Sequence, residues 1–110
     1  MPRLQYLDSV KPDFAAIALY IAVESGSAAV ARQFIKSLRH KCQKLSTLPG
    51  TMGRDRSELQ PGLRSIAHRG YIIYFRYTAD RFQIVNILEG HRDAASHFGL
   101  DAADESETDD

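Results

Sequence analysis

The sequence predicts an α+β fold in which an antiparallel helical hairpin packs on one face of a small antiparallel sheet. Two observations indicate this class. Residues 10–48 contain two stretches with helical spacing of apolar residues, separated by Ser25-Gly26-Ser27. Three apolar segments then follow between residues 63 and 88, joined by short turn sequences. Helices grouped ahead of strands, rather than alternating with them, are typical of α+β proteins.

The first elements are a short N-terminal strand and a helix. Leu4–Leu7 is apolar-rich and is expected to form an edge strand. Ser9 is expected to cap the helix, and Pro12 is tolerated in its first turn, where a missing N–H has no partner to lose. We interpret Phe14–Val23 as an amphipathic core helix, because ten residues are too few to span a bilayer. Its buried face repeats at i, i+3, i+4 and i+7 and comprises Phe14, Ile17, Ala18 and Ile21.

A second helix is expected from Ala28 to Leu48, between Ser27 as its cap and Pro49-Gly50 as its end. The short link between the two helices predicts an antiparallel hairpin. Cys42 lies on the apolar face and is interpreted as a buried, unreactive thiol. It is the single cysteine, so an internal disulfide is impossible and a reducing cytoplasm fits the chain. The apolar face comprises Ala31, Phe34, Ile35, Leu38, Cys42 and Leu45.

An antiparallel meander is expected after the helices, because Arg69-Gly70 and Ala79-Asp80 mark tight turns between apolar segments. The last strand is apolar on both faces, which predicts a central position covered on both sides. Ala94–Phe98 is expected to form a final helical turn. The aromatic residues of the middle strand are interpreted as packing residues rather than a platform for nucleic-acid bases. The three strands are Leu63–Ala67, Tyr71–Thr78 and Arg81–Leu88.

The charge is unevenly distributed along the chain, although the formal net charge is zero. Residues 101–110 hold six of the 14 acidic residues and no base, which leaves eight acids against 14 bases in residues 1–100, a net charge of +6. We therefore expect one basic domain over residues 1–100 and a disordered acidic tail over residues 101–110. The protein is expected to be cytoplasmic, without a membrane anchor.

Two stretches carry the candidate functional residues, the arginine-rich loop Gly53–Arg64 and the segment after the last strand. A guanidinium group pairs bidentately with oxyanions, so such residues suit a phosphate or an acidic partner. Ordinary ion pairing is the alternative, with Glu58 or Glu89 as partner for Arg64 and Asp93 as partner for Arg92. The candidates are Arg54, Arg56, Arg64, His91, Arg92 and His97.

No metal site or cofactor is expected. His91 and His97 are six residues apart, with no Cys, Asp or Glu arranged to complete a ligand set. His68 is expected on a turn, and His40 on the polar side of the second helix.

The chain resembles the RelE/ParE superfamily of toxins from bacterial toxin–antitoxin modules over roughly residues 3–99. The resemblance lies in the order strand, helical hairpin and meander, and in short motifs at matching places. These motifs are Tyr20-Ile21-Ala22, Gly53-Arg54, Glu58-Leu59, Pro61-Gly62-Leu63-Arg64-Ser65, Tyr71-Ile72-Ile73-Tyr74 and His91-Arg92-Asp93.

Within the superfamily the chain looks more like the ParE branch, whose members are described as poisons of DNA gyrase. RelE-like members are described as ribosome-dependent mRNA endonucleases, a reaction that needs a proton acceptor, a proton donor and cations. Those nucleases typically carry a tyrosine near the C-terminus, and the matching position in this chain is Phe98, which has no hydroxyl. Arg54 and Arg56 replace the loop lysines of RelE, and arginine does not transfer protons at ordinary pH. We therefore expect no catalytic residues.

The ParE resemblance implies a cognate ParD-like antitoxin with a ribbon-helix-helix DNA-binding domain. Its tail would fold over the groove beside the helical hairpin and across the basic sheet. DNA gyrase is the implied target, and direct DNA binding by the toxin alone is not expected. The alternative is a nuclease of the RelE or YoeB kind with Arg64, Arg92 and His97 around the phosphate. A second alternative is a non-toxic module that only binds a partner.

Overall fold

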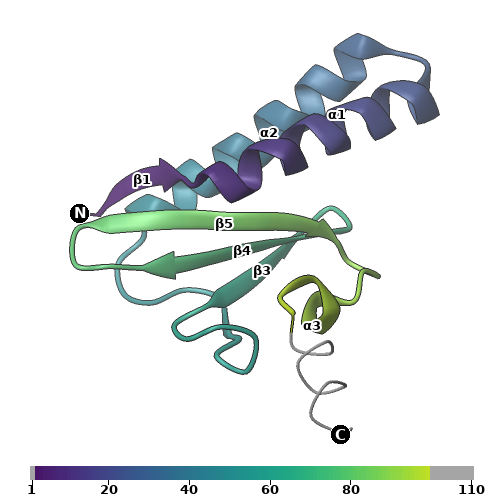
Figure 1. The fold of residues 1–110 in the computed structure, drawn as a ribbon. Helices are drawn as coiled ribbons and strands as arrows, with labels where there is room; N and C mark the ends of the chain where they lie inside the picture. The colour runs from purple at the N-terminus through teal and green to yellow at the C-terminus, as the bar shows by residue number, and fades with distance from the viewer. Residues whose placement is uncertain (1, 100–110) are drawn as a thin grey trace, which may run out of the picture.

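The fold is a helical hairpin above a five-stranded sheet, with a short helix below it (Figure 1). The computed structural model describes residues 2–99, so the predicted acidic tail at 101–110 lies outside the described residues. The predicted elements are all present, and a short strand in the arginine-rich loop is added to them. The elements are β1 (Arg3–Tyr6), a 3-10 turn η1 (Asp8–Val10), α1 (Lys11–Ser25), α2 (Ala28–Thr47), β2 (Arg54–Asp55), β3 (Arg64–His68), β4 (Tyr71–Tyr77), β5 (Arg81–Glu89) and α3 (Ala94–His97).

The sheet has the strand order β1-β5-β4-β3-β2. β2 to β5 pair antiparallel, as the meander predicts. β1 is an edge strand, also as predicted, but it pairs parallel with β5, with Arg3 opposite Arg81 and Tyr6 opposite Ile84. The sheet is therefore mixed rather than wholly antiparallel. This pairing joins the two ends of the domain, and no local turn signal in the sequence reveals it.

β5 is irregular at its middle, where the pairing with β4 changes register. Tyr74 of β4 lies opposite Asn86, whereas the next residue, Phe75, lies opposite Ile84, so Val85 is an extra residue in the ladder. Such a bulge changes which face the following side chains take. Ile84 and Ile87 consequently enter the same core on the helix side, although they are three residues apart.

Ser9 and Asp13 continue the hydrogen bonding of β5 beyond the end of β1. The Ser9 hydroxyl donates to the Val85 carbonyl at 2.6 Å, and the Asp13 carboxylate accepts from the Ile87 backbone N–H at 2.9 Å. The Asn86 side-chain amide also donates to Asp13, at 2.8 Å. Ser9 is therefore not the cap of α1, as its position in the sequence suggests; Val10 occupies that place without a side-chain cap.

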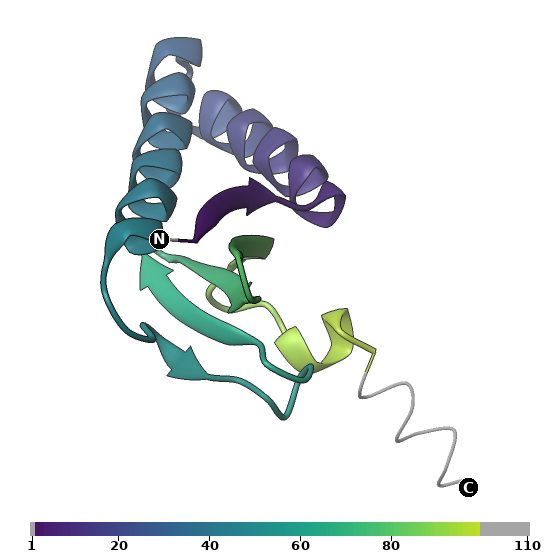
Figure 2. The ribbon, with the colours of Figure 1, turned by 90° about the vertical axis from the view of Figure 1, so that its left-hand side faces the viewer.

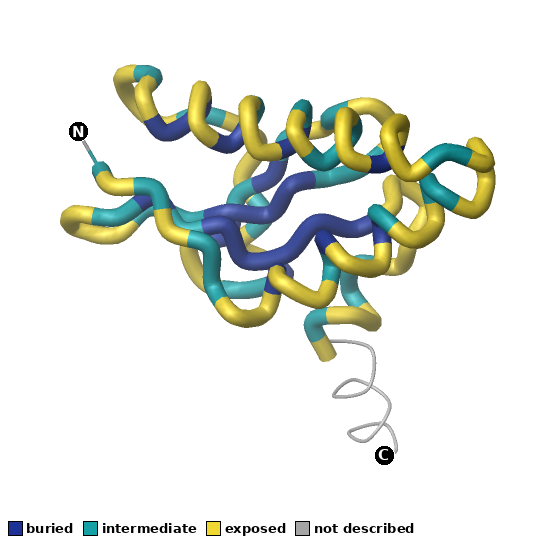
Figure 3. Tube along the Cα trace, turned by 90° about the horizontal axis from the view of Figure 1, so that it is seen from above, coloured by how far each residue is buried: buried dark blue, intermediate teal, exposed yellow. Residues whose placement is uncertain are grey.

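The hairpin turn between the helices forms as the sequence predicts. Gly26 ends α1 in the left-handed conformation (φ 70°), and the Ser27 hydroxyl caps α2 by accepting from the Val30 N–H at 3.2 Å. Figure 2 shows the hairpin on one side of the sheet and α3 on the other. Figure 3 shows exposed residues along the outer side of both helices and buried strands beneath them.

Two apolar clusters lie on opposite faces of the sheet. The cluster under the hairpin includes Phe14, Leu38, Phe75 and Phe82. The second cluster, on the other face, contains Leu59 and Leu63 from the arginine-rich loop, together with Tyr74, Val85 and Leu88; Phe98 packs against it. Both faces of β5 are thus covered, as its sequence predicts.

We expect Asp13→Ala to destabilise the fold by about 2–3 kcal/mol, because the Ile87 N–H would lose its acceptor beneath α1 and the Asn86 amide would keep only the Ser9 carbonyl. For a domain of this size that corresponds to a drop of roughly 10 °C or more in the melting temperature. The matched control is Asp8→Ala, which removes only an exposed ion pair with Lys11 (3.0 Å). Equal losses for the two variants in thermal unfolding would contradict this account.

Cys42 is buried beneath the hairpin, which confirms the prediction from its position. Burial raises the pKa of its thiol to about 11 and that of the neighbouring Tyr6 hydroxyl to about 12. The guanidinium of Arg39 lies over the Phe14 ring, 4.6 Å from its centre, and closes this side of the core. The neutral thiol is a weak nucleophile, so Cys42 serves packing.

The raised pKa of Cys42 predicts a loss of stability at alkaline pH. Below pH 9 the thiol is protonated in both the folded and the unfolded chain. Between pH 9 and 11 the unfolded chain loses this proton first, so the free energy of unfolding falls as pH rises. The melting temperatures of the wild type and Cys42→Ala should therefore converge as pH rises from 9 to 11. Parallel pH profiles would show that the thiol does not contribute.

Candidate partner-binding surfaces

The arginine-rich loop is tied to the sheet by Arg64. Its guanidinium donates to the carbonyl of Met52 at 2.7 Å and to that of Gly53 at 2.8 Å. It pairs with neither Glu58 nor Glu89, the ion-pair partners considered from the sequence. Gly53 is required at this point, because a Cβ there would lie 2.7 Å from both the Phe75 ring and the Ser65 carbonyl. The bonds of Arg64 explain how this loop is held against β3.

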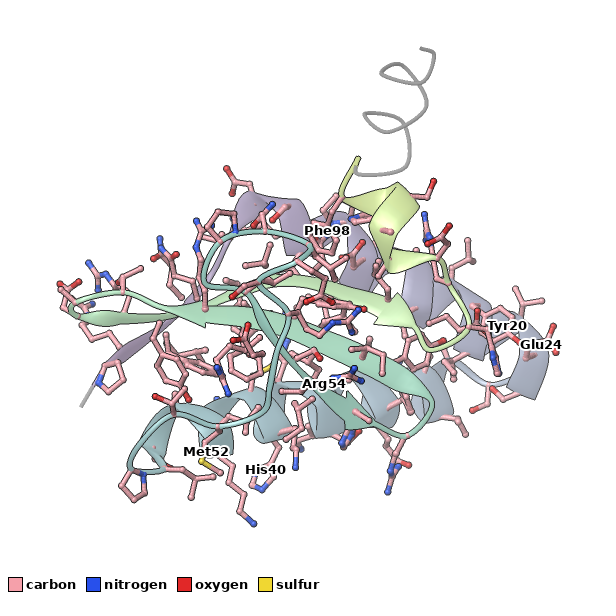
Figure 4. The ribbon with its side chains drawn as sticks, turned by 90° about the horizontal axis from the view of Figure 1, so that it is seen from below. Tyr20, Glu24, His40, Met52, Arg54 and Phe98 are labelled. Atoms are coloured by element: carbon pink, nitrogen blue, oxygen red, sulfur yellow. The ribbon has the colours of Figure 1, made fainter. Side chains whose placement is uncertain are left out.

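Arg54 and Arg56 lie on the same loop but differ in their surroundings. Arg54 is exposed on β2, over the face of the sheet away from the hairpin (Figure 4). Arg56 bonds Glu58 at 2.7 Å and stands over the Tyr74 ring at 5.9 Å. The hydrogen bond from Arg56 lowers the pKa of Glu58. Arg54 is therefore available to a partner, whereas Arg56 already has a carboxylate.

His91 and Arg92 are exposed on the turn after β5. Arg92 does not pair with Asp93 as considered from the sequence, since the ion pairs among residues 2–99 are Lys11–Asp8 and Arg56–Glu58. Asp93 instead caps α3 by accepting from the Ser96 N–H at 3.3 Å. Arg92 lines a small hollow with residues of α1 and β5, among them Asp13 and Glu89.

His97 lies elsewhere, in a polar hollow of about 520 Å³ between α3 and β5. Its neighbours in this hollow include Arg76 of β4, Asn86 of β5 and Gln60 of the loop. The side-chain oxygen of Gln60 is buried without a hydrogen-bond partner in the described chain. Arg76, which the sequence did not single out, is the arginine that shares a hollow with His97.

The three residues of the nuclease alternative thus lie in separate parts of the molecule. Arg64 holds backbone carbonyls, Arg92 lines the hollow beside α1, and His97 lines the hollow beside Arg76. Phe98 packs edge-on against Tyr74, with ring centres 5.4 Å apart, and has no proton to transfer. Phosphodiester cleavage needs its cations and proton-transfer groups around a single phosphate. The described arrangement does not bring these three residues to one hollow.

The outer side of the hairpin carries an exposed apolar surface. Leu19 and Val23 on α1 are both 67% exposed, and Val30 on α2 is exposed as well. Figure 4 places Tyr20 and Glu24 near the free end of the hairpin. Contiguous exposed apolar residues of this kind mark interaction sites in soluble proteins. The interpretation of α1 as a simple amphipathic helix is wrong on this side, because its outward face is apolar too.

A groove between the helices continues this apolar surface. Its volume is about 640 Å³, and its apolar lining is joined by three basic side chains. We call it the hairpin groove. It is lined by Ala18, Leu19, Ala22, Ala28, Ala31, Ile35, Arg32, Lys36 and Arg39. Small residues leave the hollow open, and the basic ones suit a partner that is apolar and acidic.

The family resemblance implied a groove beside the helical hairpin, but the residues that line it were not identified from the sequence, because α1 was interpreted only through its buried face. The signal was present: Phe14–Val23 is apolar all round, more than one buried face requires. A helix of this composition in a two-layer domain has to expose apolar residues on its outer side.

Comparison with known proteins agrees with the fold. The family described as the ParE toxin of the type II toxin–antitoxin system parDE matches residues 4–94. Toxin ParE3 of Caulobacter vibrioides is 30% identical over 76 residues, which cover 69% of this chain and 75% of that protein. The chromosomal ParDE TA system from P. aeruginosa contains a chain of similar fold (TM-score 0.71, 21% identity, 81% and 96% of the two chains covered).

A hairpin with an exposed apolar groove above a mixed sheet is therefore the fold of a type II toxin. The chain belongs to the ParE toxin family of parDE systems. Within residues 2–99, none of the helices has the length and apolar character needed to cross a membrane.

The bonds of Arg64 predict a structural role for this residue. Arg64→Ala should lower the free energy of unfolding by about 1–2 kcal/mol, because two charged hydrogen bonds to the loop are lost. Arg92→Ala is the matched control, an exposed arginine whose removal should leave the melting temperature nearly unchanged. If Arg64→Ala were as stable as Arg92→Ala, its bonds to the loop would contribute little, and contact with a partner would become its main role.

Proposed function

We propose that this ParE toxin inhibits DNA gyrase by binding it, without catalysing a reaction. The proposal follows from membership of the ParE family and is supported by the dispersal of Arg64, Arg92 and His97 over separate surroundings. Arg54, His91 and Arg92 are exposed candidates for contact with the target, whereas His97, which is exposed too, lies apart in the hollow beside Arg76.

We propose further that a ParD-like antitoxin, with a ribbon-helix-helix DNA-binding domain, neutralises the toxin by placing its tail in the hairpin groove. The hairpin groove is the observation that carries this proposal. A tail that folds on binding can cover a large surface with a short segment. The face of the sheet away from the hairpin is already covered by Leu59, Leu63 and Phe98. We therefore assign the tail to the hairpin rather than to the sheet.

A ribosome-dependent mRNA endonuclease is the second candidate, favoured by one observation. The hollow beside α3 combines an imidazole, His97, with a guanidinium, Arg76. An imidazole can accept or donate a proton, and a guanidinium can stabilise a phosphate. This pair is a more compact candidate site than the three residues considered from the sequence.

Purified toxin should be added in parallel to a gyrase supercoiling reaction and to a translation extract. We expect inhibition of supercoiling with accumulation of cleaved DNA, and intact mRNA in the extract. Equimolar antitoxin should restore supercoiling. His97→Ala is the matched variant for the nuclease candidate and should inhibit gyrase as well as the wild type does.

Two outcomes would overturn the gyrase proposal. Ribosome-dependent cleavage of mRNA that is lost in His97→Ala would establish the nuclease instead. Full activity of both gyrase and ribosomes in the presence of toxin would leave only a partner-binding module.

The hairpin groove yields a prediction for antitoxin affinity. Leu19→Asp with Val23→Asp should weaken antitoxin binding by about 100-fold or more, because burial of each apolar side chain contributes about 1.5 kcal/mol or more and tenfold in affinity is about 1.4 kcal/mol. The control is Thr51→Asp with Ala79→Asp, which adds the same charge at exposed loop positions. Calorimetric titration measures both. Equal affinities would exclude the hairpin groove as the binding site.

A further inference from the structure

A second groove, on the other side of α2, is strongly basic. It lies between α2 and the turn that joins β3 to β4, and its volume is about 580 Å³. We call it the basic groove. Six of its lining residues carry or can carry positive charge: Lys36, His40, Lys41, Lys44, His68 and Arg69. Gln33 and Ser37 complete the lining, and no acidic side chain takes part.

The cations of the basic groove are not neutralised by carboxylates of the described chain. The two ion pairs in residues 2–99 join Lys11 to Asp8 and Arg56 to Glu58, both away from the groove. The His68 imidazole lies among these charges. Desolvation lowers its pKa, and the positive charges of Arg69 and Lys41 lower it further. Positive charges are therefore held together here without internal compensation, which raises the local concentration of anions.

The backbone presents Arg69 in an uncommon way. His68 pairs with Tyr71, so Arg69 and Gly70 form a two-residue hairpin turn in which both have positive φ, 50° and 87°. Asn, Asp or Gly usually occupies the first position of such a turn, because a longer side chain is strained there. An arginine kept at a strained position beside α2 points to a role for its charge.

The spacing of the groove residues suits a polymer of regularly placed negative charges. Three basic side chains are spaced four residues apart along α2: Lys36, His40 and Lys44. At about 1.5 Å per residue they lie about 6 Å apart along the helix axis and extend over about 12 Å. A nucleic-acid strand carries one phosphate per about 3.4 Å of helix axis, so this length faces three or four phosphates. Gln33 supplies a side chain of the kind that contacts phosphate oxygens, whereas the Ser37 hydroxyl already donates to the Phe34 carbonyl at 2.7 Å.

We propose that the basic groove binds the phosphate backbone of nucleic acid, independently of base sequence. The lining holds no aromatic side chain other than the two imidazoles, and it offers no stacking platform for bases. This inference revises the expectation, taken from the family resemblance, that the toxin alone does not bind DNA. It does not depend on gyrase, because the groove itself supplies the charges.

The test is a titration of fluorescent 20-base-pair duplex DNA and of single-stranded RNA with the full-length chain, followed by anisotropy. With about three phosphates neutralised, affinity between 50 and 200 mM salt should fall about 40-fold for the duplex and about 20-fold for the single strand. The variant Lys36→Gln, Lys41→Gln, Lys44→Gln should bind at least about tenfold more weakly at low salt and lose most of the salt dependence. Glutamine is a good helix former, so the fold of α2 should be retained.

The matched control removes three positive charges elsewhere, with Arg3→Gln, Lys11→Gln and Arg81→Gln, and should bind like the wild type. Binding of duplex DNA or of RNA supports the proposal for the basic groove. The ratio of the two affinities shows which of the two nucleic acids the groove prefers. In the wild type, the His68 ring signals in NMR spectra should shift on addition of the bound nucleic acid, which provides a readout that needs no variant.

Three results would overturn the proposal. The triple groove variant and the control could bind equally, or neither nucleic acid could bind at low salt. Alternatively, poly-glutamate could displace the nucleic acid at equal charge concentration, which would assign the groove to an acidic protein. The titration contains no gyrase, so its result is separate from that of the supercoiling assay.

Discussion

The edge of β5 next to β1 is the part of the structure on which the rest depends. β1 pairs with β5 only as far as Tyr6, and beyond that point Ser9 and Asp13 supply the hydrogen bonds that a longer strand would have made. These bonds fix the start of α1 over the bulge at Val85. The position of α1 fixes the hairpin, and the hairpin presents both the hairpin groove and the basic groove. Side-chain hydrogen bonds to β5 thus set where the two grooves lie on the molecule.

Local patterns were sufficient to predict the elements and their packing. Helical spacing, the Ser25-Gly26-Ser27 turn and the two hairpin turns identify α1, α2 and the three long strands with small errors at their ends. The parallel pairing of β1 with β5 could not be predicted in this way, since its partners are almost 80 residues apart. The role of Ser9 was misjudged for the same reason: a serine before a helix is usually a cap, and here β5 competes for its hydroxyl.

The candidate site was harder to predict than the fold, because residue type does not reveal how a charge is used. Arg64 and Arg56 look like partner-binding residues in the sequence, yet both bond within the chain. The basic groove went unnoticed because its members come from two segments, residues 33–44 and 68–69, which become neighbours only in the fold. The two grooves along α2 are features that only the fold brings together.

Amide hydrogen exchange of the free toxin at Ile87 tests most directly whether α1 is locked to β5. The account predicts that this N–H, held by the Asp13 carboxylate, exchanges only when the whole domain unfolds, as slowly as the amides in the centre of β4. The hairpin and its two grooves would then be preformed before any partner binds. Exchange of Ile87 at the rate of the exposed loop amides, with the centre of β4 still protected, would contradict the account.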